Sequence, residues 1–238
     1  MQDTLTTAPA APERLAFSRS APVSRSSSSA RILILCGDGF SAAKYYEFVR
    51  AYPDAEVWSM NAQRIPEATR HFDIHFHEQP ENMRSRAFAH DAGAEVIVSP
   101  FAVPCAARSE VRFPLLDIFN RFGTALYQRT LCFMLALACH EHATGRRPID
   151  RLCLPGHDFN SWPHFGMRDG PHLWLGVARG LYITPITAPG SSLGKRWLDL
   201  WRRMPPVDWL HDLRIDQPHL YGHPRAITAP HAAFYRWE

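Results

Sequence analysis

The chain has 238 residues, of which 46% are hydrophobic and 21% charged, and these fractions exclude a wholly disordered, collagen-like or coiled-coil protein. That length suits one globular domain with a full hydrophobic core. The net charge of +3 arises from 26 basic and 23 acidic residues, so charge alone does not indicate nucleic-acid binding. No apolar run reaches the roughly 20 residues that a membrane-spanning helix needs.

Cysteine usage and the N-terminal segment both indicate a reducing compartment. The chain has five widely spaced cysteines, and no two of them form a C-x-x-C pair. Such a pattern is typical of small buried thiols rather than of disulfides. Residues 1–30 are rich in Ala, Pro, Ser and Thr and lack the apolar core of a secretion signal. We therefore expect a cytoplasmic protein with a disordered leader over residues 1–30.

Apolar segments of strand length recur along the chain after this leader. The first, at 32–36, is a continuous apolar run that stops at Gly37, which is typical of a central parallel strand covered on both faces. Further strands are predicted at 56–60, 72–77, 95–98 and 151–154, and a sixth begins at 182.

Helical segments separate these strands. They are predicted at 42–51, 81–90, 123–143 and 171–179. The third is apolar nearly all round, so we expect it to be buried. This alternation predicts an α/β fold with a doubly wound, mostly parallel, Rossmann-like sheet over residues 31–194. The Trp- and Pro-rich residues 195–238 are expected to form a helix and an irregular wrap, or a contact between copies in a homo-oligomer.

The turn after the first strand is a candidate ligand site. In open parallel sheets, ligands bind beyond the carboxyl ends of the strands, near the point where the strand order reverses. The sequence Gly-Asp-Gly-Phe-Ser at 37–41 follows a strand and opens a helix, so its amides can meet an anionic group. It lacks the third glycine of the dinucleotide fingerprint, which weakens an NAD-dehydrogenase interpretation. A tight turn without a ligand is the alternative.

Several short motifs resemble two related Rossmann-like families. The run C-G-D-G-F-S at 36–41 resembles the G-N-G-P-S-L turn of bacterial sialyltransferases that use CMP-sialic acid, and of 6-hydroxymethylpterin diphosphokinase-like proteins. Three further matches follow in the order that these families have. Segment 57–61 is similar to their strand that ends in asparagine, segment 121–125 to the start of their long helix, and segment 152–159 to their strand-G-x-D-F element. The run W-L-G-V-A-R-G at 174–180 looks like a helix of phage- and prophage-encoded members.

The resemblance implies a nucleotide-binding transferase that uses a nucleotide-activated donor such as a CMP-sugar. The residues it assigns to the nucleotide are Gly37, Asp38, Gly39, Ser41, Asn61, Arg121, Gly123, Thr124 and Asp158. Asn61 would hydrogen-bond the base or ribose, while Thr124 and Arg121 would hold phosphate. A general base for the acceptor hydroxyl is expected at His164 or at His157, because imidazole titrates near neutrality and both follow the fifth strand.

Two other functions stay open. A non-catalytic phage- or prophage-type protein would bind or assemble without turnover, and Asp38, which stands where the families have asparagine, favours it. A diphosphokinase would need Mg²⁺, which Asp158 at a strand end could coordinate. The expected partner in the first interpretation is a nucleotide or nucleotide-sugar, and nucleic acid is not expected.

Two groups of histidines in the sequence are candidate metal sites. His71, Asp73, His75 and His77 alternate along the predicted third strand, so they share one face and could bind zinc. Helices should cover that face, however, and we assign no metal there. The sequence His140-Glu141-His142 lacks the H-E-x-x-H spacing, and we expect a solvated helix end.

Overall fold

The structure is a computed structural model, and it describes residues 30–37, 42, 45–74, 80–102, 104, 108–123, 126–127, 129–157, 169–185 and 219–220. The expected disordered leader, and all but two residues of the Trp- and Pro-rich C-terminal segment, lie outside the described residues.

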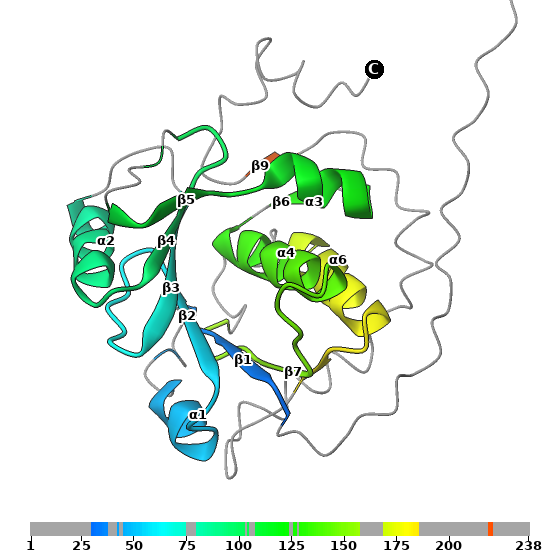
Figure 1. The fold of residues 1–238 in the computed structure, drawn as a ribbon, viewed down its shortest axis with the longest axis horizontal. Helices are drawn as coiled ribbons and strands as arrows, with labels where there is room; N and C mark the ends of the chain where they lie inside the picture. The colour runs from blue at the N-terminus through cyan, green and yellow to red at the C-terminus, as the bar shows by residue number, and fades with distance from the viewer. Residues whose placement is uncertain are drawn as a thin grey trace, which may run out of the picture.

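A parallel sheet forms the middle of the described structure (Figure 1). Its seven strands are β1 (Ile32–Leu35), β2 (Glu56–Met60), β3 (Ala68–Asp73), β4 (Glu95–Val98), β5 (Glu110–Arg112), β7 (Arg151–Cys153) and β8 (Thr184–Pro185). They lie in the order β5-β4-β3-β2-β1-β7-β8, and every pairing is parallel. The chain builds outward from β1 to β5 and then returns to add β7 on the other side of β1. The strand order therefore reverses between β1 and β7.

Helices cover both faces of this sheet. The described helices are α1 (Tyr45–Ala51), α2 (Pro80–Asp91), α3 (Leu115–Phe122), α4 (Thr130–Ala143) and α6 (Asp169–Gly180). The first two lie on one face, and α3, α4 and α6 lie on the other (Figure 1). The predicted α/β fold with a parallel sheet is confirmed. Within the described ranges, no helix combines the length and the hydropathy needed to cross a membrane.

Helix α4 is the centre of the larger core. Eleven of its fourteen residues are buried, because it lies between the sheet and helices α3 and α6. Its Phe133 ring contacts the rings of Phe113 and Tyr127, with centroids 4.9 and 4.6 Å apart. The prediction of a buried helix here is confirmed. The described cysteines are likewise buried free thiols: Cys36, Cys132, Cys139 and Cys153.

The predicted start of this helix at residue 123 is wrong. Helix α3 ends at Phe122, and Gly123 caps it in the left-handed conformation, with φ of 67°. The next described element is the short strand β6 (Leu126–Tyr127), which pairs in parallel with β9 (His219–Leu220). Helix α4 begins only at Thr130. A glycine in this conformation ends a helix, so the apolar pattern of 123–143 conceals a break.

The third strand also lies elsewhere than predicted. Strand β3 begins at Ala68 and ends at Asp73, whereas the apolar alternation suggested 72–77. The sequence pattern missed its first half because Arg70 is charged, yet the Arg70 side chain is only 7% exposed. Strand β5 and helix α3 lie between residues 98 and 123, where neither a strand nor a helix was predicted.

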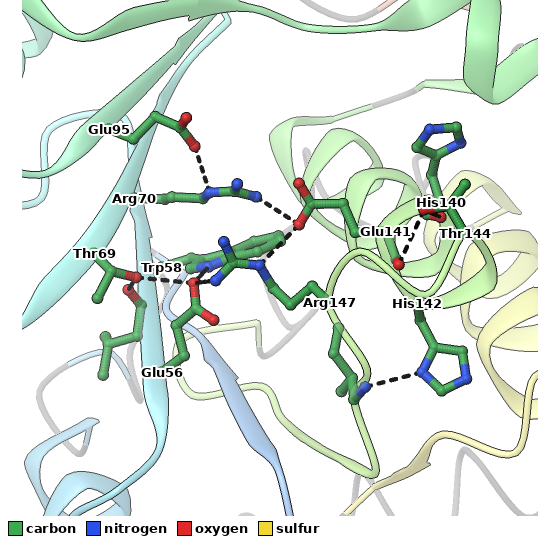
Figure 2. Close-up of polar contacts among 12 residues, drawn as sticks. Glu56, Trp58, Thr69, Arg70, Glu95, His140, Glu141, His142, Thr144 and Arg147 are labelled. Atoms are coloured by element: carbon green, nitrogen blue, oxygen red, sulfur yellow. Dashed lines mark hydrogen bonds and ion pairs between the residues drawn. The ribbon is translucent and has the colours of Figure 1, made fainter.

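Arg70 is held by ion pairs that join three elements (Figure 2). Its guanidinium lies 2.6 Å from the Glu95 carboxylate at the start of β4, and 2.8 Å from that of Glu141 near the end of α4. Its charged group also lies 5.0 Å from the centre of the Trp58 ring. The network therefore ties the last turn of α4 to the amino-terminal edge of the sheet.

Arg147 completes this network. It contacts the Glu141 carboxylate at 3.0 Å and forms an ion pair with Glu56, which also accepts a hydrogen bond from the indole of Trp58. The Glu141 side chain is 2% exposed, so the expectation of a solvated helix end is wrong. Its partner in β3 is 71 residues away in the sequence, which is why local spacing does not reveal the pairing.

Replacing Glu141 with glutamine is expected to destabilise the protein strongly. The change leaves the buried Arg70 without one of its two carboxylates, and breaking a buried ion pair costs about 3 kcal/mol of unfolding free energy. Thermal or urea unfolding measures this loss.

The matched control is Glu95→Gln, which removes the other carboxylate of the same arginine. Because the Glu95 side chain is 35% exposed, water replaces part of the lost interaction, and we expect a loss of about 1 kcal/mol. Equal losses for the two variants would contradict a dominant role of the buried pair.

Candidate functional site

The loops that follow β1 and β7 touch where the strand order reverses. The Gly37 N–H donates a hydrogen bond of 2.7 Å to the Pro155 carbonyl, which extends the pairing of the two strands. A Cβ on Gly37 would lie 2.6 Å from the Gly156 carbonyl oxygen, and one on Gly156 would lie 2.1 Å from that of Gly37. Gly156 also has a φ of 78°. Both positions therefore require glycine, because the two backbones approach each other closely.

His157 lies directly over Gly37. A Cβ on Gly37 would come within 2.5 Å of the His157 Nδ1, so the imidazole occupies the place of the missing side chain. The His157 residue is 4% exposed. Of the two histidines predicted to act as a base, this one lies at the strand-order reversal, and His164 lies outside the described residues.

The turn after β2 joins the same edge. Asn61 has a φ of 53°, and the Gln63 N–H donates to the Met60 carbonyl at 3.1 Å, which closes the turn. The Gln63 side chain accepts from the Met60 N–H at 3.2 Å and donates to the Gly37 carbonyl. The Thr130 hydroxyl, in the first turn of α4, donates to the Asn61 Oδ1 at 3.1 Å. The edge thus joins β1, β2, β7 and the amino end of α4.

Two residues predicted to bind the nucleotide lie at the far end of α4. Arg121 is exposed near the end of α3. Burial lowers the pKa of His140, ten positions along α4 from Thr130, and the nearby charge of Arg121 also lowers it. Gly123 caps α3. The structure thus brings Gly37, Asn61 and His157 to one edge and leaves Arg121 and Gly123 at another. The other predicted contacts lie outside the described residues: Asp38, Gly39, Ser41, Thr124, Asp158 and His164.

Sequence reasoning missed three residues of this edge. Gly156 lies two residues beyond the end of a predicted strand, a position where glycine often permits close approach, so that signal was available. Gln63 falls within the loop after the second strand, but its two partners are backbone groups that no pattern reveals. Thr130 was hidden because the helix start was placed seven residues too early.

A second polar cluster lies under α2, on the opposite face of the sheet from α4. The His71 Nδ1 and the Ser59 hydroxyl are 2.9 Å apart. Asp73 and Glu110 both contact Arg86 of α2, at 3.5 and 2.6 Å. His71 and Asp73 thus face this helix, and no three metal-ligating side chains converge among the described residues. His75 and His77 lie outside them.

His71 is neutral in the folded protein. Burial, together with the charges of His90 and Arg86, lowers the pKa of its imidazole from 6.5 to about 4. The ring therefore serves as a hydrogen-bonding neighbour of Ser59 rather than as a cation.

Comparison of the chain with protein-family models, with curated proteins and with solved structures found no match. The case for a site at the carboxyl edge rests on the geometry of this chain.

Replacing Gly156 with alanine is expected to cost about 3 kcal/mol or more of unfolding free energy, because the new Cβ meets the Gly37 backbone and the positive φ disfavours it. Gly93→Ala is the matched control. Its φ of 79° is nearly the same as that of Gly156, but no atom lies within 4 Å of its Cβ position, so only about 1 kcal/mol should be lost. The unfolding free energy of both variants is measured by thermal unfolding. Equal losses would contradict the idea that the close contact between the two loops requires glycine at position 156.

Stability should fall in acid partly because of His71. Its folded-state pKa of about 4 lies below the unfolded value of 6.5, so the unfolded chain binds the proton first as pH falls. The full stability is present above pH 6.5, and up to about 3 kcal/mol is lost between there and pH 4.

The His71→Asn variant isolates this contribution, because asparagine does not titrate and its amide can still reach Ser59. Urea unfolding across the range should show a shallower pH dependence for the variant than for the natural chain. Parallel curves would contradict a lowered His71 pKa.

Proposed function

We propose that this protein is a nucleotide-binding transferase that uses a nucleotide-activated donor such as a CMP-sugar. The observation that supports this most is the strand-order reversal between β1 and β7, where Gly37 and Gly156 are in backbone contact and His157 lies beside them. In open parallel sheets, nucleotides and similar ligands bind outside the carboxyl ends of the strands at such a point.

The phosphate is best assigned to the amino end of α4. This helix has no side-chain cap, so its first amides and its dipole are suited to an anion. The contact between Thr130 and Asn61 puts that end next to the turn after β2. Gly37 is not assigned to the phosphate, because both of its backbone groups already have partners. Its N–H donates to the Pro155 carbonyl, and its carbonyl accepts from the Gln63 amide.

Transfer at this edge requires little chemistry from the protein. The acceptor hydroxyl oxygen forms a bond to the anomeric carbon of the donor, and the bond from that carbon to the phosphate oxygen breaks. The nucleotide leaves with the electron pair, and the acceptor proton passes to an imidazole, which we assign to His157 among the described residues. Catalysis then consists mainly of positioning, and of stabilising the leaving phosphate at the helix end.

A thermal-shift screen tests nucleotide binding first. The purified protein is heated with CMP, CDP, UDP, GDP, ATP or NAD, each with and without Mg²⁺. A nucleotide at about 100 times its dissociation constant adds about 2.7 kcal/mol of stability, so Tm should rise by roughly 5–10 °C. We expect the cytidine nucleotides to give this shift. A shift with ATP that requires Mg²⁺ would favour the diphosphokinase instead, and no shift with any ligand would favour a binding or assembly role.

Two variants separate binding from transfer. Asn61→Gly keeps a residue suited to the positive φ but removes the carboxamide that accepts from Thr130. The unliganded Tm should therefore fall modestly, and the CMP shift, measured from that lower Tm, should shrink. His157→Asn should keep the CMP shift and lose release of CMP from a CMP-sugar. Full turnover in the second variant would exclude His157 as the base.

A further inference from the structure

Gln63 connects two turns of the carboxyl edge through a single side chain. It lies in the turn after β2, two residues beyond Asn61, and is half-buried. Its carboxamide oxygen accepts from the Met60 N–H at 3.2 Å, and its amide nitrogen donates to the Gly37 carbonyl. The first contact holds the side chain against its own turn, and the second reaches across to the turn after β1.

This bridge lies where the strand pairing has ended. The last β1–β2 contact along the edge is the Cys36 N–H bond to the Trp58 carbonyl, at 2.9 Å. Beyond it, the Gly37 carbonyl has the Gln63 amide as its partner, while the Gly37 N–H turns toward β7. Gly37 thus stands between β7 on one side and Gln63 on the other.

We infer that Gln63 is a positioning residue of the nucleotide site, an assignment that rests on the proposed function. It sets the spacing between Gly37 and the turn that carries Asn61. Thr130 fixes Asn61 to the amino end of α4 from the other side. A nucleotide bound beside Gly37, Asn61 and the helix end needs all three at fixed distances, and Gln63 supplies the link that the sheet does not.

The direction of the hydrogen bond makes this role testable. The Gly37 carbonyl can only accept, so its partner must donate. Gln63→Glu keeps the shape of the side chain, but an ionised carboxylate cannot donate and repels the carbonyl oxygen. A protonated glutamic acid regains one O–H donor, and partial burial beside the Gly37 carbonyl oxygen favours this form by raising the pKa of the introduced carboxyl. Lowering the pH therefore restores the bridge without any change of shape.

The experiment measures CMP affinity by calorimetry for the natural chain and for Gln63→Glu, at about pH 7.5 and about pH 5. We expect binding by the variant to be about tenfold weaker at the higher pH, and the deficit to shrink to about twofold at the lower pH. Each value is a ratio to the natural chain at the same pH, so titration of other groups and of the ligand cancels. A purely structural contact would lower Tm without this recovery of affinity.

Ala62→Glu is the matched control, because it adds the same charge to an exposed position of the same turn. Its loss of CMP affinity measures the repulsion between an added carboxylate and the nucleotide phosphate. Any larger loss of affinity in Gln63→Glu is due to the broken hydrogen bond to Gly37. If the natural chain binds CMP and Gln63→Glu binds it equally well, or no better at low pH, the role of Gln63 is overturned while the proposed function stands. If the natural chain binds none of the nucleotides, both are overturned.

Discussion

The rest of the structure depends on the burial of α4. A helix that is apolar on all sides must be covered on all sides, so it lies between the sheet and two further helices. At roughly 1.5 Å per residue, its fourteen residues span about 20 Å, from one edge of the sheet to the other. Glu141 anchors one end through Arg70, and Thr130 meets Asn61 at the other end. The same helix therefore stabilises the core and brings its amino end to the candidate site.

The two edges of the sheet differ in how they use polar groups. At the amino-terminal edge, Arg70 and Arg147 share the buried carboxylate of Glu141 in a network of ion pairs. Where β1, β2 and β7 end, the described contacts between the turns join neutral groups, with Gln63 and Thr130 as side-chain donors. A charged ligand at the first edge would have to break ion pairs that hold the fold. At the second edge it would meet dipoles and amides, which can stabilise an anion without losing a structural partner.

The parts of the fold that follow from local patterns were predictable. The continuous apolar run before Gly37 identified the central strand, and the alternation of elements identified the parallel sheet. Predictions failed where a distant partner decides the outcome. Arg70 is a strand residue because Glu95 and Glu141 neutralise it, and Glu141 is buried for the same reason. The helix break at Gly123 required a backbone conformation that the apolar pattern does not encode.

The candidate site was predictable only as a place and not as a set of contacts. The rule that ligands bind beyond the carboxyl ends of the strands selected the loops after the predicted strands, and the structure brings two of them together where Gly37 and His157 meet. In the structure, Gly37 accommodates the imidazole of His157 and the backbone of Gly156. The close approach at Gly37 thus belongs to the protein itself, and a ligand at this edge has to bind beyond this contact.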